Sequence, residues 1–151
     1  AAKLIKDKNV IVIPSKTIPQ GITAMLNVTE QNAQQMQQTM IESMENVVSA
    51  SVTYAVRETV FGGKQIQEGD IIGMQEDNIA VISKSAENGA KELLKKIVTE
   101  EAEMISIYYG EDVTQKEAEN IKKYAEKNFP NCDVELQRGG QPLYYYIISV
   151  E

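Results

Sequence analysis

The stretch QRGGQPLYYYIISVE, residues 137–151, decides how the last part of the chain folds. Its first residues, Arg138-Gly139-Gly140-Gln141-Pro142, have the composition of a tight turn or a short connection. The residues behind them are rich in tyrosine and isoleucine, which are typical of a strand. A terminal segment stays ordered when a sheet holds it. We therefore predict that residues 143–151 form a strand tied into the fold, entered through a hairpin or a tight crossover.

The residues before this strand predict an α-β-α-β-β order. Residues 85–98 place alanine, leucine and isoleucine at helical spacing, and residues 104–110 form a short apolar strand. The next helix opens at a T-x-x-E capping box, residues 114–117, and Pro130 closes it. Residues 132–137 then form the strand that the glycine-rich segment joins to the last one.

The first part of the chain combines an apolar run with two helices. NVIVIP, residues 9–14, is short, continuous and β-branched, so it predicts a buried strand of the parallel type. Pro19 marks the start of a first helix. A second helix is expected over 27–45, where Asn27 and Glu30 resemble a capping box.

The second helix carries an apolar stripe at helical spacing. Its members are Ala33, Met36, Met40, Ile41 and Met44. A stripe rich in methionine is either a pliable binding surface or, as is commoner, a face of the core.

The period then changes from helical to extended. Residues 47–59 alternate apolar and polar side chains, and three further short strands, separated by glycine turns, follow up to residue 83. This pattern predicts antiparallel hairpins. Arg57 ends the first of these strands, where it is either a solvated charge or a contact for an anion or a partner.

These elements predict an α/β fold with α+β character, in which mixed sheets are flanked by helices. We expect two lobes: residues 1–83, an incomplete α/β lobe with antiparallel hairpins, and residues 84–151, the α-β-α-β-β lobe. Residues 1–8 resemble the end of a helix but are too few to form one alone. We therefore expect this sequence to be a piece of a longer polypeptide.

Composition narrows the chemistry. The net charge of −7 disfavours nucleic acid and anionic membrane as partners, and no apolar run is long enough to insert into a membrane. The absence of histidine excludes a histidine-based triad or metal site within this sequence. The one cysteine, Cys132, fits a reducing cytoplasm and, without histidine, is expected to be a small core residue and not a nucleophile. No phosphate-binding glycine motif is present, and FGGKQ at 61–65 is expected to be a hairpin turn.

The remaining candidate site residues are polar groups in loops and one tyrosine. Ser15, Thr17 and Gln20 line a loop between a predicted strand and a helix start, a common ligand-binding position in α/β folds. Arg138 beside Gly139 and Gly140 could bind a phosphate or carboxylate, or could be a solvated rim arginine. Tyr144, Tyr145 and Tyr146 alternate faces, so at least one ring should be exposed or at an interface, and Tyr144 is our candidate. We predict that loop 15–21 and the turn at 138–142 lie on a common face.

Several segments together resemble a known family. They are NVIVIPSKTIPQGITAMLN, VTYAVRET, EGDIIGM, ISIYYGEDVT and RGGQPLYYYIISVE. With them the chain, over essentially its whole length, resembles the carboxyl-terminal region of bacterial proteins that carry a dihydroxyacetone-kinase-like ATP-binding domain, namely the kinase subunit of fatty acid kinase and its relatives.

The resemblance implies a fold similar to DegV-type fatty-acid-binding proteins and dihydroxyacetone kinase substrate domains. It implies a cytoplasmic docking domain for a separate DegV-like protein, whose bound fatty acid the full kinase subunit would phosphorylate on its carboxylate. ATP and magnesium are then expected in an ATP-binding domain outside these residues, no cofactor is expected in this chain, and a homodimer could form through the full-length protein.

Two departures bear on these expectations. Dihydroxyacetone kinases hold their substrate through a histidine, which this sequence lacks, and DegV proteins have a Gly-Pro-Gly-type motif where this chain has residues 138–142. Two functions therefore stay open beside each other. One is the docking domain, and the other is a small-molecule or fatty-acid-binding module that uses Ser15, Thr17, Arg57 and Arg138. Catalysis by this chain alone is not expected.

Overall fold

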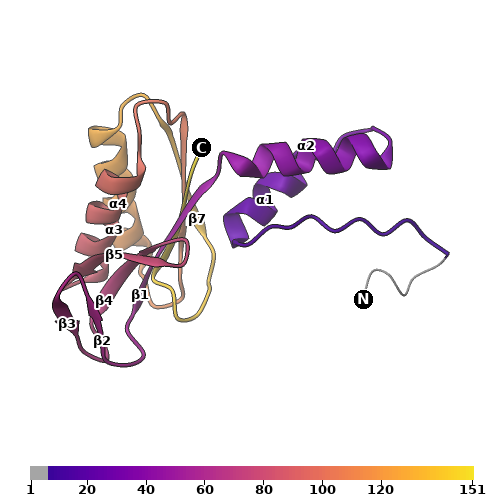
Figure 1. The fold of residues 1–151 in the computed structure, drawn as a ribbon. Coiled ribbons are helices and arrows are strands. Elements are labelled where there is room, and N and C mark those ends of the chain that lie inside the picture. The colour runs from indigo at the N-terminus through magenta and orange to yellow at the C-terminus, as the bar shows by residue number, and fades with distance from the viewer. Residues whose placement is uncertain (1–6) are drawn as a thin grey trace. The chain divides into compact units, whose positions relative to one another are not determined.

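The computed structural model describes residues 7–151 and divides the chain into two compact units, which meet at Val47 and Val48. Each unit is described by itself (Figure 1). The predicted α/β class is confirmed, because helices and a six-stranded mixed sheet are both present. The helix end expected at residues 1–8 lies, except for Asp7 and Lys8, outside the described residues.

The first unit contains two helices that pack against each other, α1 (Ile18–Leu26) and α2 (Ala33–Glu45). Pro19 lies in the first turn of α1, as predicted. Met40 and Met44 are buried, which supports the core interpretation of the methionine stripe.

Two expectations for the first unit are wrong. Residues 9–14 form no strand, and Val10 and Val12 are exposed. A strand needs a neighbour to pair its backbone groups, and in the part of the chain that the structure describes none pairs with this run.

The second error concerns the start of α2. Asn27 does not cap that helix but ends α1, where its side-chain amide donates to the carbonyl oxygen of Thr23 at 2.9 Å. The cap of α2 is Asn32, whose side-chain oxygen accepts from the backbone N–H groups of Gln34 and Gln35. Asn32 directly precedes the helix and can reach these free donors, whereas Asn27 lies a full turn too early.

The second unit is built on the six-stranded sheet, in the order β5-β4-β1-β8-β6-β7. Only the β6–β7 pair is parallel. The strands are β1 (Val48–Tyr54), β4 (Ile71–Gln75), β5 (Asn78–Ser83), β6 (Met104–Tyr109), β7 (Asp133–Arg138) and β8 (Tyr146–Val150).

Two helices, α3 (Ala86–Ile97) and α4 (Gln115–Asn128), cover one face of this sheet (Figure 1). The capping box of Thr114 and Glu117 at the start of α4 is present as predicted. The core beneath the helices includes Leu93, Ile107 and Ile148, each fully buried. Burial of such aliphatic side chains stabilises the unit by roughly 2 kcal/mol each.

The predicted last strand lies inside the sheet. It pairs with β1 on one side and with β6 on the other, and all five residues of β8 are buried. Because β6 lies between β7 and β8, residues 139–145 form a crossover and not a hairpin.

A separate hairpin completes the second unit. It consists of β2 (Thr59–Phe61) and β3 (Lys64–Ile66), joined by Gly62 and Gly63, both with positive φ. The FGGKQ turn is thus confirmed. Ile66 anchors the hairpin in a small second core with Ala55 and Ile72.

The units differ from the expected lobes 1–83 and 84–151. The contacts separate the chain at 47/48, because β1, β4 and β5 share one sheet with β6, β7 and β8. None of the helices within residues 7–151 is long and apolar enough to cross a membrane.

Candidate functional site

The polar residues predicted around the start of α1 serve the helix itself. The Thr17 side chain accepts from the backbone N–H of Gln20 at 3.3 Å, and the Gln20 side-chain oxygen accepts from the backbone N–H of Lys16 at 2.9 Å. These contacts satisfy donors that the first turn leaves free. Ser15 is exposed just before them.

The other predicted site residues lie in the second unit. Arg57 is exposed on the connection from β1 to β2, and Arg138 is exposed at the end of β7. Within the described range 7–151, neither guanidinium has a hydrogen-bond or ion-pair partner. The prediction that loop 15–21 shares a face with the 138–142 turn stays a prediction, because the two segments belong to different units.

The crossover of residues 139–145 is fastened to the end of β6 by backbone hydrogen bonds. The N–H groups of Gly139 and Gly140 both donate to the carbonyl oxygen of Tyr109, at 3.0 and 3.1 Å. Gly140 has a φ of +64°, which glycine adopts without strain. Both predicted glycines therefore shape the crossover, and their N–H groups are already used.

Gly110 allows the crossover to lie directly over the loop after β6. A β-carbon at this position would overlap the carbonyl oxygens of Tyr144 and Gln141. The Gly110 N–H donates to the Tyr145 carbonyl oxygen at 2.9 Å, and the Glu111 N–H donates to that of Gln141 at 3.2 Å. The side-chain amide of Gln141 donates to the Tyr108 carbonyl oxygen at 3.1 Å. The crossover is thus a well-supported loop.

The tip of this loop has an unusual backbone. Leu143 has a φ of +70°, and the Tyr144 N–H donates to the Pro142 carbonyl oxygen at 2.8 Å across it. This is a γ-turn with positive φ, which is rare and strained for a leucine. Such strain persists only where neighbouring contacts hold the segment in place.

The tip also presents apolar surface. The Leu143 side chain is 58% exposed and that of Tyr144 is 41% exposed. Tyr145 is half-buried and packs edge-on against Tyr54, with ring centroids 6.4 Å apart, and Tyr146 is buried. The expectation that one of the three tyrosines is exposed is therefore confirmed, and it is Tyr144.

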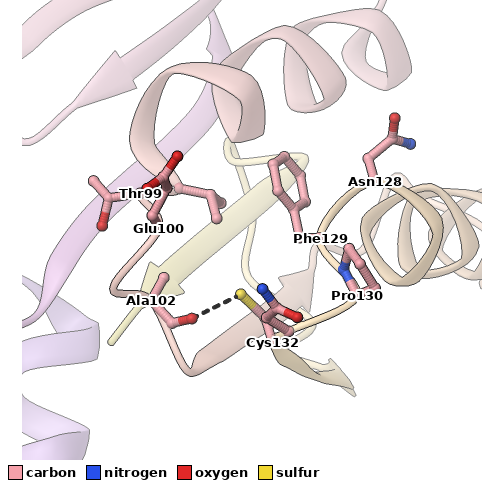
Figure 2. Close-up of a pocket in the computed structure, with 9 residues that line it drawn as sticks. Thr99, Glu100, Ala102, Asn128, Phe129, Pro130 and Cys132 are labelled. Carbon is pink, nitrogen blue, oxygen red and sulfur yellow. Dashed lines mark hydrogen bonds between the residues drawn. The ribbon is translucent and has the colours of Figure 1, made fainter.

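A small cavity lies at the opposite end of β6 and β7, between the ends of α3 and α4 (Figure 2). Its volume is about 260 Å³. It is lined by Val98, Thr99, Glu100, Ala102, Asn128, Phe129, Pro130, Asn131 and Cys132. None of the other predicted site residues lines it.

Cys132 lies at the wall of this cavity. Figure 2 shows its sulfur directed at the carbonyl oxygen of Ala102, to which it donates a hydrogen bond of 3.1 Å. Burial raises the pKa of the Cys132 thiol, and the charge of Asp133 raises it further. A raised pKa keeps the thiol protonated, so this cysteine lacks the environment of a nucleophile. Among residues 7–151, no three Cys, Asp or Glu side chains are grouped to hold a metal ion.

Sequence reasoning did not single out Gly110, Gln141, Leu143 or Thr53 as parts of this surface. Thr53 donates a side-chain hydrogen bond to the Leu143 carbonyl oxygen. A glycine at the end of a strand could have suggested a close backbone approach at Gly110. The positive φ of Leu143 has no such signal, because leucine rarely adopts it.

Comparison with known proteins supplies the family. All residues, 1–151, match the model of the FakA-like C-terminal family, a family of fatty acid kinase components. Protein YloV of Bacillus subtilis (strain 168) is 38% identical over 151 residues, which cover 99% of this chain and 27% of that protein. An uncharacterized protein of Staphylococcus aureus (strain USA300) is 35% identical over 99% of this chain and 28% of its own length. The chain thus spans about a quarter of the curated relatives it matches.

Proposed function

The chain belongs to the FakA-like C-terminal family of fatty acid kinase components, and from this premise we propose that it is a docking domain. It binds a separate DegV-like protein that carries a fatty acid, so that an ATP-binding domain elsewhere in the longer protein can phosphorylate the acyl carboxylate. The observation that carries the proposal is the strained, exposed tip of the crossover at Leu143 and Tyr144.

A rigid apolar tip suits protein recognition. Binding energy at interfaces concentrates in a few apolar and aromatic side chains that enter pockets of the partner. Because backbone hydrogen bonds already fix residues 139–145, little conformational entropy is lost when Leu143 and Tyr144 become buried. An exposed leucine held at positive φ costs stability in the free domain, which favours a functional reason for it.

Arg138 adds a charge next to this tip. Its exposed guanidinium follows directly on β7 and precedes the two glycines of the crossover. An unpaired arginine can form a bidentate pair with a carboxylate of the partner. In a chain with a net charge of −7, it also favours approach of a partner at this particular surface.

The alternative function is a module that binds a fatty acid or another small molecule. The cavity beside Cys132 is the feature that favours it. Its volume of about 260 Å³ is close to the lower limit of ligand pockets. Its lining contains the acidic Glu100 but no lysine or arginine, so it offers no counter-charge to a fatty acid carboxylate. This supports docking over direct binding of fatty acid.

A calorimetric titration separates the two functions. The chain is titrated with a fatty-acid-loaded DegV-like protein of the same organism and, in parallel, with free fatty acid and with ATP. Heat from the loaded carrier alone supports docking. Heat from free fatty acid without heat from the carrier supports the alternative and rejects docking.

Variants then locate the surface. Leu143→Gly and Arg138→Glu are each expected to weaken carrier binding by about tenfold while the circular dichroism spectrum stays unchanged. Val60→Thr is the matched control, because Val60 is 70% exposed on β2 and lies outside the crossover. Equal affinity of all three variants and the original chain would reject the crossover as the docking surface.

A further inference from the structure

Strand β7 forms one edge of the six-stranded sheet, and half of its backbone groups have no partner strand. The Asp133 N–H donates to the Glu103 carbonyl oxygen at 2.8 Å, and the Gly139 N–H donates to that of Tyr109 at 3.0 Å. In a parallel pair, alternate residues direct both backbone groups to the neighbour. The N–H and carbonyl groups of Val134, Leu136 and Arg138 therefore point away from β6, along the free edge.

The opposite edge of the sheet is protected in a way that β7 is not. In β5, the register with β4 shifts and leaves Ala80 unpaired in a bulge, and the Lys96 ammonium donates to the Ala80 carbonyl oxygen. Bulges and lysines are common means of preventing an edge strand from pairing. The β6–β7 register instead continues through six consecutive pairs without a bulge, and β7 contains no proline.

The side chains beside this free edge are acidic on one face. Val134 and Leu136 pack toward the core below the helices, whereas Asp133 and Glu135 are exposed on the other face. Burial raises the pKa of Tyr108 on the neighbouring strand, and the charges of Glu135 and Glu151 raise it further, so these carboxylates lie close to that phenol. An extended segment along β7 would therefore meet negative charge at every second residue on this face.

We propose that the free edge of β7 accepts an extended basic segment of a protein partner as an additional strand. Main-chain hydrogen bonds to Val134, Leu136 and Arg138 would supply the register. Lysine or arginine at alternate positions of the segment would face Asp133 and Glu135. A second copy of the chain fits this edge poorly, because antiparallel pairing of two β7 strands sets carboxylates against carboxylates. The proposal does not depend on docking through the crossover.

Hydrogen exchange of single amides, followed by NMR, tests the site. The probe is a short peptide of alternating lysine and valine with blocked ends. Without peptide, the amides of Glu135 and Gln137 should exchange slowly and those of Val134 and Leu136 fast, because only the first pair donates to β6. With peptide, the amides of Val134, Leu136 and Arg138 should become at least about tenfold slower. Binding that leaves these three amides unchanged, or no binding at about 1 mM peptide, overturns the proposal.

Two matched controls separate strand addition from simple charge attraction. The same peptide methylated on the backbone nitrogens of its valines keeps its charge but cannot pair with an edge, so it should not protect the β7 amides. Glu135→Lys should weaken peptide binding by about tenfold, whereas Glu92→Lys, exposed on α3, makes the same change of net charge and should have little effect. Equal weakening by both variants, or protection by the methylated peptide, also overturns the proposal.

Discussion

The side-chain hydroxyl of Thr53 donates a hydrogen bond of 2.7 Å to the carbonyl oxygen of Leu143, which lies 90 positions further along the chain. This bond joins the end of β1 to the strained tip of the crossover. The Tyr145 N–H adds a second link to β1 through the Val52 carbonyl oxygen at 2.9 Å. The shape of the tip is therefore fixed from β1 as well as from β6, the strand that the crossover passes.

Replacement of Thr53 tests this link. Thr53→Val keeps the shape of the side chain but removes the donor, so the free energy of unfolding should fall by about 1 kcal/mol. Denaturant unfolding of the chain measures the change. Thr53→Ser retains the hydroxyl and should recover part of the loss; a valine variant as stable as the original chain would show that the bond contributes nothing.

Gly110 should be far less tolerant of substitution than a glycine in open space. In Gly110→Ala, the added methyl group meets the backbone oxygens of Tyr144 and Gln141, which cannot rotate away as a side chain could. We expect a loss of about 3 kcal/mol in the free energy of unfolding.

The control for this substitution is Gly62→Ala, at the turn between β2 and β3. No atom lies within 4 Å of a β-carbon built there, and only the positive φ of 57° opposes it. It should cost about 1 kcal/mol. Equal losses for the two alanine variants would contradict the close approach of the crossover to Gly110.

The elements that sequence predicted well carry their signals locally. The capping box of α4 needs only Thr114 and Glu117, and the turn of the β2–β3 hairpin needs only the Gly62-Gly63 pair. The last strand was also predictable, because Tyr146 and Ile148 stand in a run of aromatic and β-branched residues that favours a strand over a helix.

The errors arose where a partner far along the chain decides the structure. The run at 9–14 has strand composition, but composition does not supply a neighbouring strand. The crossover was compatible with a hairpin until the position of β6 between β7 and β8 was known. Of the candidate site, the exposure of Tyr144 followed from alternation, whereas the strained backbone of Leu143 depends on Thr53 and could not be derived from nearby residues.

The capping box predicts a specific pH dependence of stability. The Thr114 hydroxyl and backbone N–H both donate to the Glu117 carboxylate, at 2.6 and 2.9 Å, and these bonds lower the pKa of Glu117 below its ordinary value of 4.5. Because the folded-state pKa is the lower one, the contribution is complete above the unfolded-state pKa and is lost as the pH falls through the folded-state pKa.

Glu117→Gln removes the titrating group and tests this sign. The difference in unfolding free energy between the original chain and the variant should shrink as the pH is lowered from 7 toward about 3. Thr114→Ala removes the hydroxyl donor and should reduce the same acid-side dependence. If the glutamine variant loses stability in acid as steeply as the original chain, the capping box does not cause the effect.

Leu143 offers a test of the strained tip that does not involve any partner. At ordinary positions an alanine variant is more stable than a glycine variant by roughly 0.4–1 kcal/mol, because glycine leaves the unfolded chain more freedom. At a φ of +70° the order should reverse, since a β-carbon costs roughly 1–2 kcal/mol in the left-handed region and glycine does not. We expect Leu143→Gly to be more stable than Leu143→Ala in thermal and denaturant unfolding. Leu143 is 58% exposed, so both variants lose little packing and the comparison isolates the backbone. The usual order, with alanine the more stable, would show that the positive φ is not held in solution, and the rigid tip on which docking is proposed to depend would then be absent.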